Sequence, residues 1–258
     1  MHTNYTLNAQ NLSIFVLSTA LALPLMVAAS AAVAAEGGPS IPGELSANVA
    51  FATDYRFRGI SQTGKNPAIQ GGLDYSVDVA DGVGVYVGVW GSSVDFNDGD
   101  QAQVEIDYYG GVTFEIKGVG VDIGLIYYTY PGASSTLNYD YVEGKIELSY
   151  SPIESLTLGI GYNYSPDYFG SSGDFHYPHA SVEFTPDLGM PLPITLSATY
   201  GYNSIDSAAA FGAPSYSDWS VGIATTYKIV ELKLQYIDND LSGSVGDPTA
   251  VFTISASF

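Results

Sequence analysis

Hydrophobic and polar residues alternate with a period of two along most of the chain. At its start, Leu45, Val49 and Phe51 share one face while Ser46 and Asn48 share the other. This pattern is typical of β-strands with one apolar and one polar face, and little of the chain has helical periodicity. The strands that it predicts lie near residues 45–59, 67–78, 83–95, 102–117, 119–130, 139–150, 153–164, 175–185, 193–203, 216–227, 229–238 and 249–258.

Short and long links alternate between these predicted strands. Short links such as "ADG" and "SPIES" are followed by long ones rich in Gly, Ser and Asp, such as "SPDYFGSSGD". The link "PDLGMPLP" is longer than the other short ones. Strict alternation is expected of an up-and-down meander whose two ends face different surroundings. A sandwich with Greek-key connections has no reason to show it.

The composition of the polar face favours a membrane barrel over a soluble sandwich. That face holds Gly, Ser, Thr, Asn and scattered acids rather than a charged solvent surface. The strands run to ~10–14 residues, longer than in soluble sheets and sufficient to cross a bilayer at a tilt. Tyrosines gather near strand ends, as in the interfacial girdles of barrels: Tyr127, Tyr128, Tyr130, Tyr139, Tyr141, Tyr162, Tyr164, Tyr200 and Tyr202.

We therefore predict an all-β fold, a transmembrane up-and-down antiparallel β-barrel of about 12 strands. In hydrocarbon every backbone N–H and C=O must be paired within the protein, so such a sheet has to close. A soluble periplasmic β-protein is the alternative architecture.

The charge balance limits the partners of the chain. Seven Lys and Arg against 27 Asp and Glu give a formal net charge of −20, yet only 13% of residues are charged and 46% are hydrophobic. An acidic disordered chain would be poorer in apolar residues. Without a basic patch, nucleic acid is not an expected partner, and cations are the favoured small partners. The absence of cysteine excludes disulfides and thiolate chemistry.

The N-terminal stretch "LSIFVLSTALALPLMVAASAAVAA" predicts an export signal. It is apolar and ends in small residues, with a small-x-small pattern at Ala32–Ala34. Its n-region carries no Lys or Arg, so an uncleaved membrane anchor is the alternative, although Pro24 interrupts the stretch. We expect a cleaved signal peptide over residues 1–35, a short segment over 36–44 and a barrel over 45–258.

The last strand, "AVFTISASF", ends at Phe258. It resembles the terminal signal by which bacterial barrel proteins are recognised for outer-membrane insertion. This resemblance implies a place in the outer membrane of a Gram-negative bacterium. The partners that it implies are outer-membrane lipid and the barrel-assembly machinery.

The first predicted hairpin carries a family resemblance. "SANVAFATDYRFRGISQTGKNPAIQGGLDYS", "GVYVGVWGSSVDF", "EIDYYGG" and "YYTYPG" resemble the TorF-like family of porins, formerly listed as bacterial proteins of unknown function. The likeness runs through essentially the whole mature chain. It implies an outer-membrane barrel with a porin role.

Catalytic and metal chemistry has little support in the sequence. His176 and His179 stand three apart in "HYPH", which on a strand directs them to opposite faces. No G-x-S-x-G or H-E-x-x-H motif accompanies them, and the acidic loops do not have the spacing of a calcium-binding loop. We expect no enzymatic activity, no catalytic residue, no metal site and no cofactor.

The polar parity instead predicts residues that line a lumen. Charges on the lipid side would cost ~2–4 kcal/mol for Arg or Lys near the midplane, so charged positions are expected to face inward. The candidate pore-lining residues are Asp54, Arg56, Arg58, Asp74, Glu105, Asp107, Glu115, Asp122, Glu143, Lys145, Glu147, Asp218, Glu231 and Lys233.

Two of the seven basic residues stand close together in "DYRFRGISQ". As part of the first strand, Arg56 and Arg58 would face the lumen, with Tyr55 and Phe57 directed to lipid near the outer rim. One hypothesis is that the arginines neutralise neighbouring carboxylates such as those of Asp54 and Asp74. The other is that they form the cationic half of a constriction.

The predicted function is passive diffusion of small hydrophilic solutes or ions through the barrel, with a weak preference for cations because acids outnumber bases. One alternative is a non-conducting structural barrel whose interior charges plug the lumen, since ~12 strands make a narrow barrel. Another is a barrel whose long loops carry an enzymatic or adhesive surface.

Overall fold

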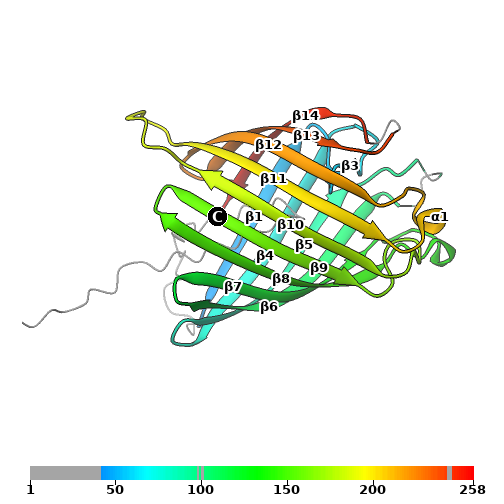
Figure 1. Ribbon diagram of the computed structural model, residues 1–258, viewed down its shortest axis with the longest axis horizontal. Coiled ribbons are helices and arrows are strands. Elements are labelled where there is room, and N and C mark those ends of the chain that lie inside the picture. The colour runs from blue at the N-terminus through cyan, green and yellow to red at the C-terminus, as the bar shows by residue number, and fades with distance from the viewer. Residues whose placement is uncertain (1–41, 98, 100–101, 243–245) are drawn as a thin grey trace, which may run out of the picture.

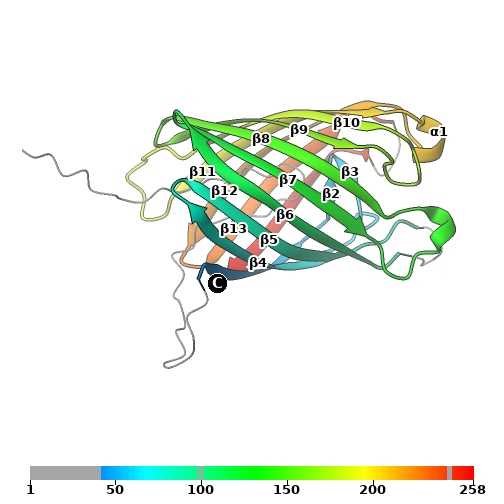
Figure 2. The same cartoon turned by 90° about the horizontal axis from the view of Figure 1, so that it is seen from below.

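The computed structural model describes residues 42–97, 99, 102–242 and 246–258, and in them twelve long antiparallel strands form a closed barrel (Figures 1 and 2). The predicted signal peptide and most of the segment 36–44 lie outside the described residues. In the described part of the chain, no helix has the length and apolar character needed to span a membrane.

The barrel strands are consecutive neighbours along the chain, with two small strands between the first and second. Their bounds are β1 (Glu44–Ala52), β4 (Ala68–Ala80), β5 (Val83–Ser93), β6 (Val104–Ile116), β7 (Val119–Thr129), β8 (Tyr141–Ile153), β9 (Leu156–Ser165), β10 (Phe175–Phe184), β11 (Ile194–Ile205), β12 (Tyr216–Tyr227), β13 (Val230–Asn239) and β14 (Thr249–Ser257). The small elements are β2 (Arg56–Phe57), β3 (Ile60–Ser61), a 3₁₀ turn (Ser135–Leu137) and α1 (Ala208–Phe211).

The barrel closes where its last strand meets its first. β14 pairs antiparallel with β1, with Asn48 opposite Ser257 and Ala52 opposite Thr253. The backbone of Phe258 extends this seam, because its N–H and its C=O each bond to Ala47 at 2.9 Å. No barrel strand is left with an open edge, which is the condition for a sheet in hydrocarbon. The predicted fold class and strand number are confirmed.

The links between strands differ at the two ends of the barrel, as the sequence predicts. β4 and β5, β6 and β7, β8 and β9, and β12 and β13 are each joined by two residues, while β10 and β11 are joined by residues 185–193. The long links, one of which carries α1, lie at the opposite end (Figure 1). Both described ends of the chain lie at the short-turn end.

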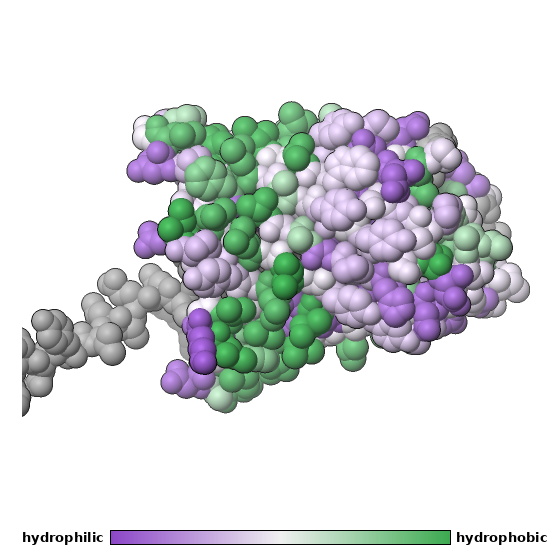
Figure 3. All heavy atoms as spheres, in the orientation of Figure 1, coloured by the Kyte–Doolittle hydropathy of each residue, from purple (hydrophilic) through white to green (hydrophobic). Residues whose placement is uncertain are grey.

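The outer surface of the barrel is a belt of large apolar side chains. Leu45, Ile69, Leu125, Ile160 and Val221 are each more than half exposed. Figure 3 shows such residues gathered over the half of the barrel that ends in short turns, with weakly polar residues over the long-loop half. A contiguous apolar surface of this extent needs an apolar solvent rather than water.

The tyrosines divide between the two faces of the wall, which corrects the predicted girdle. Tyr127, Tyr162, Tyr164, Tyr200 and Tyr202 point outward and are exposed. The others of the predicted set lie on the inner side: Tyr128, Tyr130 and Tyr141 are buried in an aromatic core, against which Tyr139 packs. Adjacent residues of a strand face opposite sides of the wall. Neighbouring tyrosines in the sequence, such as Tyr127 and Tyr128, therefore lie one on the outer surface and one in the lumen.

The first predicted strand, 45–59, is wrong in its second half. β1 ends at Ala52, and the chain then turns into the barrel to form the short hairpin of β2 and β3. Tyr55 and Phe57, predicted to face lipid, are therefore buried in the interior. Alternation continues through this segment because the hairpin is itself extended, so periodicity alone does not reveal that the chain has left the wall.

Placing a cation in the apolar belt tests which surface meets lipid. We expect Leu125→Arg, at the centre of β7, to lower the free energy of unfolding by ~2–4 kcal/mol, because the side chain must carry its charge into hydrocarbon. Denaturant titration of the barrel in lipid vesicles measures this change.

The matched control is Tyr127→Arg, one outward position nearer the long-loop rim. There the expected cost is ~0–1 kcal/mol, because the charge reaches the interface. Equal small costs at both positions would contradict a membrane-embedded belt.

Candidate functional site: the inner hairpin and the lumen

The inner hairpin, residues 54–62, is built on a two-residue turn. Arg56 pairs with Ser61 and Phe57 with Ile60 across β2 and β3. Arg58 and Gly59 form the turn, with φ of 47° and 81°. Two consecutive positive φ angles give a type I′ turn, whose twist suits a tight hairpin and which favours Asn, Asp or Gly. An arginine in left-handed backbone costs ~1–2 kcal/mol, so its side chain must offset that cost.

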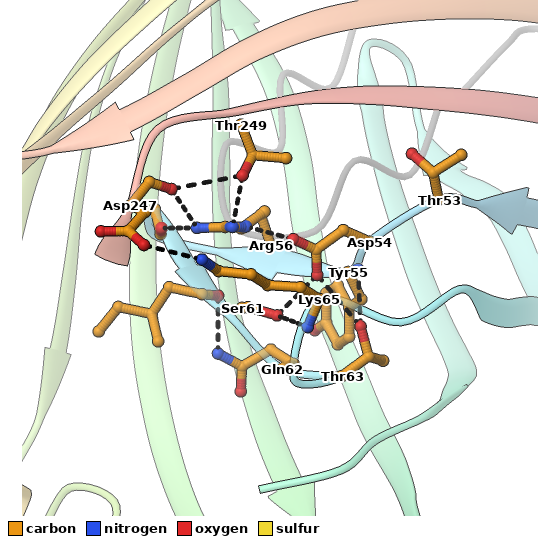
Figure 4. Close-up of polar contacts among 12 residues, drawn as sticks. Thr53, Asp54, Tyr55, Arg56, Ser61, Gln62, Thr63, Lys65, Asp247 and Thr249 are labelled. Atoms are coloured by element: carbon orange, nitrogen blue, oxygen red, sulfur yellow. Dashed lines mark hydrogen bonds and ion pairs between the residues drawn. The ribbon is translucent and has the colours of Figure 1, made fainter. Parts of the chain in front are cut away.

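The base of the hairpin is anchored by Arg56 and Asp54 (Figure 4). Arg56 Nε donates to the Asp54 carboxylate at 2.6 Å, and Ser61 Oγ donates to the same carboxylate at 2.6 Å. The Arg56 guanidinium also donates to Gly59 O at 3.0 Å and to Thr249 Oγ1 on β14 at 2.8 Å. This arginine neutralises Asp54, as the first hypothesis predicts, and it ties the hairpin to the wall.

The tip of the hairpin places Arg58 deep in the lumen. Its two terminal nitrogens donate to the two oxygens of Glu143 on β8, both at 2.7 Å. Both side chains of this ion pair have 0% exposure. The turn backbone is also held, because Tyr216 OH donates to Arg58 O at 3.0 Å and Asn239 Nδ2 donates to Gly59 O at 2.9 Å. Arg58 therefore neutralises Glu143 rather than Asp74.

Aromatic rings surround the Arg58 guanidinium. Its central carbon lies 4.3 Å from the ring centroid of Tyr177, 4.6 Å from that of Phe57 and 4.7 Å from that of Phe175. Tyr168 lies further off, at 5.9 Å, and stacks on Phe175 at 3.9 Å. Burial raises the pKa of Tyr168 to about 12, so the ring is a neutral phenol at physiological pH. Rings at these distances attract a cation through their quadrupoles.

The hairpin and this aromatic layer fill the long-loop half of the lumen. Tyr55 packs edge-on against Trp90, and Phe57 packs edge-on against Tyr128, which stacks on Tyr141. Five polar residues at this level have 2% exposure or less: Glu105, Asp107, Glu143, Asn163 and Asn203. At this level the lumen is packed like a protein core.

The middle of the lumen holds separate polar pairs. Lys145 Nζ donates to Asp122 at 2.6 Å, and Tyr86 OH donates to the same carboxylate at 2.8 Å. His179 Nε2 lies 3.0 Å from a Glu147 oxygen. These contacts join side chains from different strands, so they stabilise the wall and also pair the charges of its carboxylates.

The structure places the fourteen predicted pore-lining residues at three levels. Asp54, Arg56 and Arg58 belong to the inner hairpin, and Glu105, Asp107, Glu143 and Asp218 surround it from the wall. Asp74, whose carboxylate accepts a bond from Tyr109 OH, lies in the middle with Asp122, Lys145 and Glu147. Glu115, Glu231 and Lys233 occupy inward positions nearer the short turns. Their role in lining a conducting path stays a prediction.

The histidines lie on opposite faces of β10, as their spacing predicts. His176 faces outward, where its Nδ1 lies 2.6 Å from Tyr162 OH. His179 faces inward, where its Nε2 lies 3.1 Å from Asn163 Oδ1. In residues 42–97, 99, 102–242 and 246–258, no three or more His, Asp or Glu side chains are grouped to hold a metal ion.

Sequence reasoning missed the aromatic partners of Arg58 and the amide of Asn163, which bonds to Glu143. Phe175 and Tyr177 share the inward parity of His179, and Asn163 shares that of Gly161 on β9. The inward parity of these aromatic residues could have indicated the site. An aromatic ring that faces a polar lumen instead of lipid is expected to pack against a partner there.

A cavity of about 610 Å³ opens beyond the hairpin toward the long loops. Phe57, Tyr168 and Tyr216 lie at its floor side, and residues of the long links, among them Phe169 and Asp240, complete it. We refer to it as the vestibule. It meets the packed layer at Phe57 and Tyr168, which also contact Arg58.

Removing one partner of the Arg58–Glu143 pair should be costly. We expect Arg58→Asn, which suits the left-handed turn, to lower the free energy of unfolding by ~3–5 kcal/mol because it leaves a buried carboxylate uncompensated. Denaturant titration in detergent micelles measures the loss.

The double variant Arg58→Asn/Glu143→Gln is the control. It should recover a large part of that loss, because a neutral amide replaces the stranded charge. A double variant less stable than Arg58→Asn alone would show that the charge on Glu143 is not the source of the cost.

Solved structures of known proteins share this fold at low identity. The NanC porin has a TM-score of 0.52 and 11% identity over 83% of this chain and 99% of that chain. The KdgM porin has a TM-score of 0.52 and 8% identity over 83% and 98%. An outer membrane channel from Pseudomonas putida F1 has a TM-score of 0.50 and 12% identity over 86% and 97%. These likenesses concern the fold.

No curated protein matches the chain. A family model does match it, over residues 36–258, and that family is described as "Bacterial protein of unknown function (Gcw_chp)". Because the match includes all of the barrel, the chain belongs to this Gcw_chp family of bacterial proteins.

Proposed function

We propose that the protein is a diffusion channel for small hydrophilic solutes in the outer membrane of a Gram-negative bacterium. The observation that carries the proposal is a closed 12-stranded barrel with an apolar belt outside and a charged, polar interior. Such a wall suits a bilayer, and such an interior suits water and hydrophilic solutes. The sequence resemblance to the TorF-like porins and the shared fold of the NanC and KdgM porins support it.

The charge of the lumen favours cations. Acidic residues outnumber basic ones among the inward positions, and both arginines of the hairpin are already paired with carboxylates. Excess carboxylates lower the energy of a cation in a pore and raise that of an anion. The proposed channel is therefore weakly cation-preferring.

The inner hairpin sets the size limit of the proposed channel. It occupies the long-loop half of the lumen, where the side chains of Arg58 and Glu143 have no exposure. Passage of a solute then requires the hairpin to shift, and only small solutes suit the space that remains in a barrel of ~12 strands.

A second candidate follows from the same packing. A lumen closed by a buried ion pair and a layer of stacked rings is also what a non-conducting structural barrel would contain. In either case the C-terminal strand that ends at Phe258 is the proposed contact with the barrel-assembly machinery. The absence of enzymatic activity stays a prediction.

Electrical recording in planar bilayers tests both candidates. We expect channel events from the wild-type barrel and a reversal potential that favours potassium over chloride. Arg58→Asn should raise the conductance several-fold, because it releases the hairpin from Glu143. The folded state of each sample is checked first by heat-modifiable gel mobility.

Two results would contradict these expectations in different ways. If neither the folded wild-type barrel nor the folded Arg58→Asn variant gives channel events, the result would favour the structural barrel. A reversal potential that favours chloride would refute the cation preference while leaving the channel intact.

A further inference from the structure

The surroundings of Arg58 have the chemistry of a guanidinium-binding site. Glu143 offers two oxygens to two parallel N–H donors at 2.7 Å, the geometry that suits a guanidinium and that an ammonium cannot reproduce. Aromatic faces complete the enclosure. We define the guanidinium cage as Glu143, Asn163, Tyr168, Phe175 and Tyr177.

The cage belongs to the barrel wall and its loops, and not to the hairpin. Glu143 lies on β8, Asn163 on β9, and Phe175 and Tyr177 on β10, while Tyr168 lies in the link before β10. Asn163 Nδ2 donates to a Glu143 oxygen at 3.2 Å, and its Oδ1 lies 3.1 Å from His179 Nε2. The carboxylate is thus oriented by Asn163 of the wall as well as by Arg58, and all the cage residues lie outside the hairpin.

The present occupant is held there at a cost. Arg58 adopts a φ of 47°, a conformation that strains an arginine backbone. Its Nε is buried without a hydrogen-bond partner among the described residues, and a buried donor left unpaired is destabilising. Across the turn Arg56 pairs with Ser61 and Phe57 with Ile60, and Gln62 N–H donates to Tyr55 O at 2.7 Å. The hairpin is a separate two-stranded sheet, so its displacement would leave the barrel ladder paired, but it must also release its bonds to Thr249, Tyr216 and Asn239.

The vestibule leads to this site. Tyr168 lines both the cage and the cavity of about 610 Å³, and Phe57 of the hairpin lines the cavity and lies 4.6 Å from the Arg58 guanidinium. The cavity also presents the carboxylate residues Asp95 and Asp240, so a cation entering from the long-loop side meets favourable charge before it reaches Glu143.

We propose that the guanidinium cage binds a small solute that carries a guanidinium group, and that Arg58 is its tethered occupant. In the absence of the solute Arg58 fills the cage, and the hairpin stays in the lumen except during the shifts that the proposed channel requires. The solute replaces Arg58 on Glu143, which frees the hairpin to leave the lumen. This inference rests on the proposed channel function for its consequence but not for the binding step.

Trp90 provides a direct reporter of hairpin displacement. The chain has two tryptophans, and Trp90 packs edge-on against Tyr55 of the hairpin with ring centroids 5.5 Å apart. Trp219→Phe leaves Trp90 as the single emitter. Titration of the folded Trp219→Phe barrel with methylguanidinium chloride, against sodium chloride at equal ionic strength, should change its emission saturably. Half-saturation is expected on the order of millimolar, the effective concentration of a group on a short tether.

The control for this titration is Trp219→Phe/Glu143→Gln, which keeps the aromatic rings and removes the charge that the ligand needs. Its emission should not respond saturably. A missing response in Trp219→Phe, or an equal response in the Glu143→Gln variant, would overturn the proposal.

The emptied cage supplies a second readout. In Arg58→Asn the turn is relaxed and the cage has no tethered cation, so methylguanidinium should raise the unfolding temperature, by binding the native state alone. Arg58→Asn/Glu143→Gln should show no such rise. Methylammonium is the second ligand control, and equal stabilisation by it would overturn the guanidinium specificity.

The two measurements together separate this inference from the channel function. Stabilisation of Arg58→Asn without a Trp90 response in Trp219→Phe would overturn the displacement of Arg58. Binding in both the emission and the unfolding assays, without channel events in bilayers, would support the guanidinium cage and contradict the proposed diffusion channel.

Discussion

The ion pair of Arg58 with Glu143 is the interaction on which the interior of this barrel depends. A carboxylate with no exposure is too costly to leave alone, because burial removes it from water. The hairpin brings the counter-charge to it, and the rings of Tyr177 and Phe175 take up the rest of the guanidinium surface. The hairpin is inside the lumen because this pair can form only there, and the left-handed backbone of Arg58 is tolerated for the same reason.

The closed wall supplies the rigidity that such a pair requires. Every barrel strand is bonded on both sides, and the seam between β1 and β14 is completed by Phe258. Side chains on β8 and β10 therefore keep their spacing without help from the hairpin. The hairpin is a separate two-stranded sheet inside this wall, so the displacement proposed above would leave the barrel strands paired.

Much of the wall could be predicted from the chain alone. The inward placement of Glu143, Lys145 and Glu147 follows from their positions two apart on one strand, and the split of His176 from His179 follows from an odd spacing. Part of the candidate site could be predicted in the same way, since the sequence pattern predicts that Arg58 and Glu143 both face inward. Their pairing was not, because they are 85 residues apart in the chain and parity does not give distance across a lumen.

The wall could be derived from the amino-acid chain alone, because each strand presents apolar residues to lipid and polar residues to the interior. This requirement appears in the sequence as a period of two. The three-dimensional contacts were needed to see that the chain leaves the wall after Ala52, and that Tyr55 and Phe57 are buried rather than facing lipid. The physical reason is that a hairpin and a wall strand are equally extended and alternate alike. What separates them is a long-range contact, the neutralisation of a buried Glu143 by an arginine from the first long link.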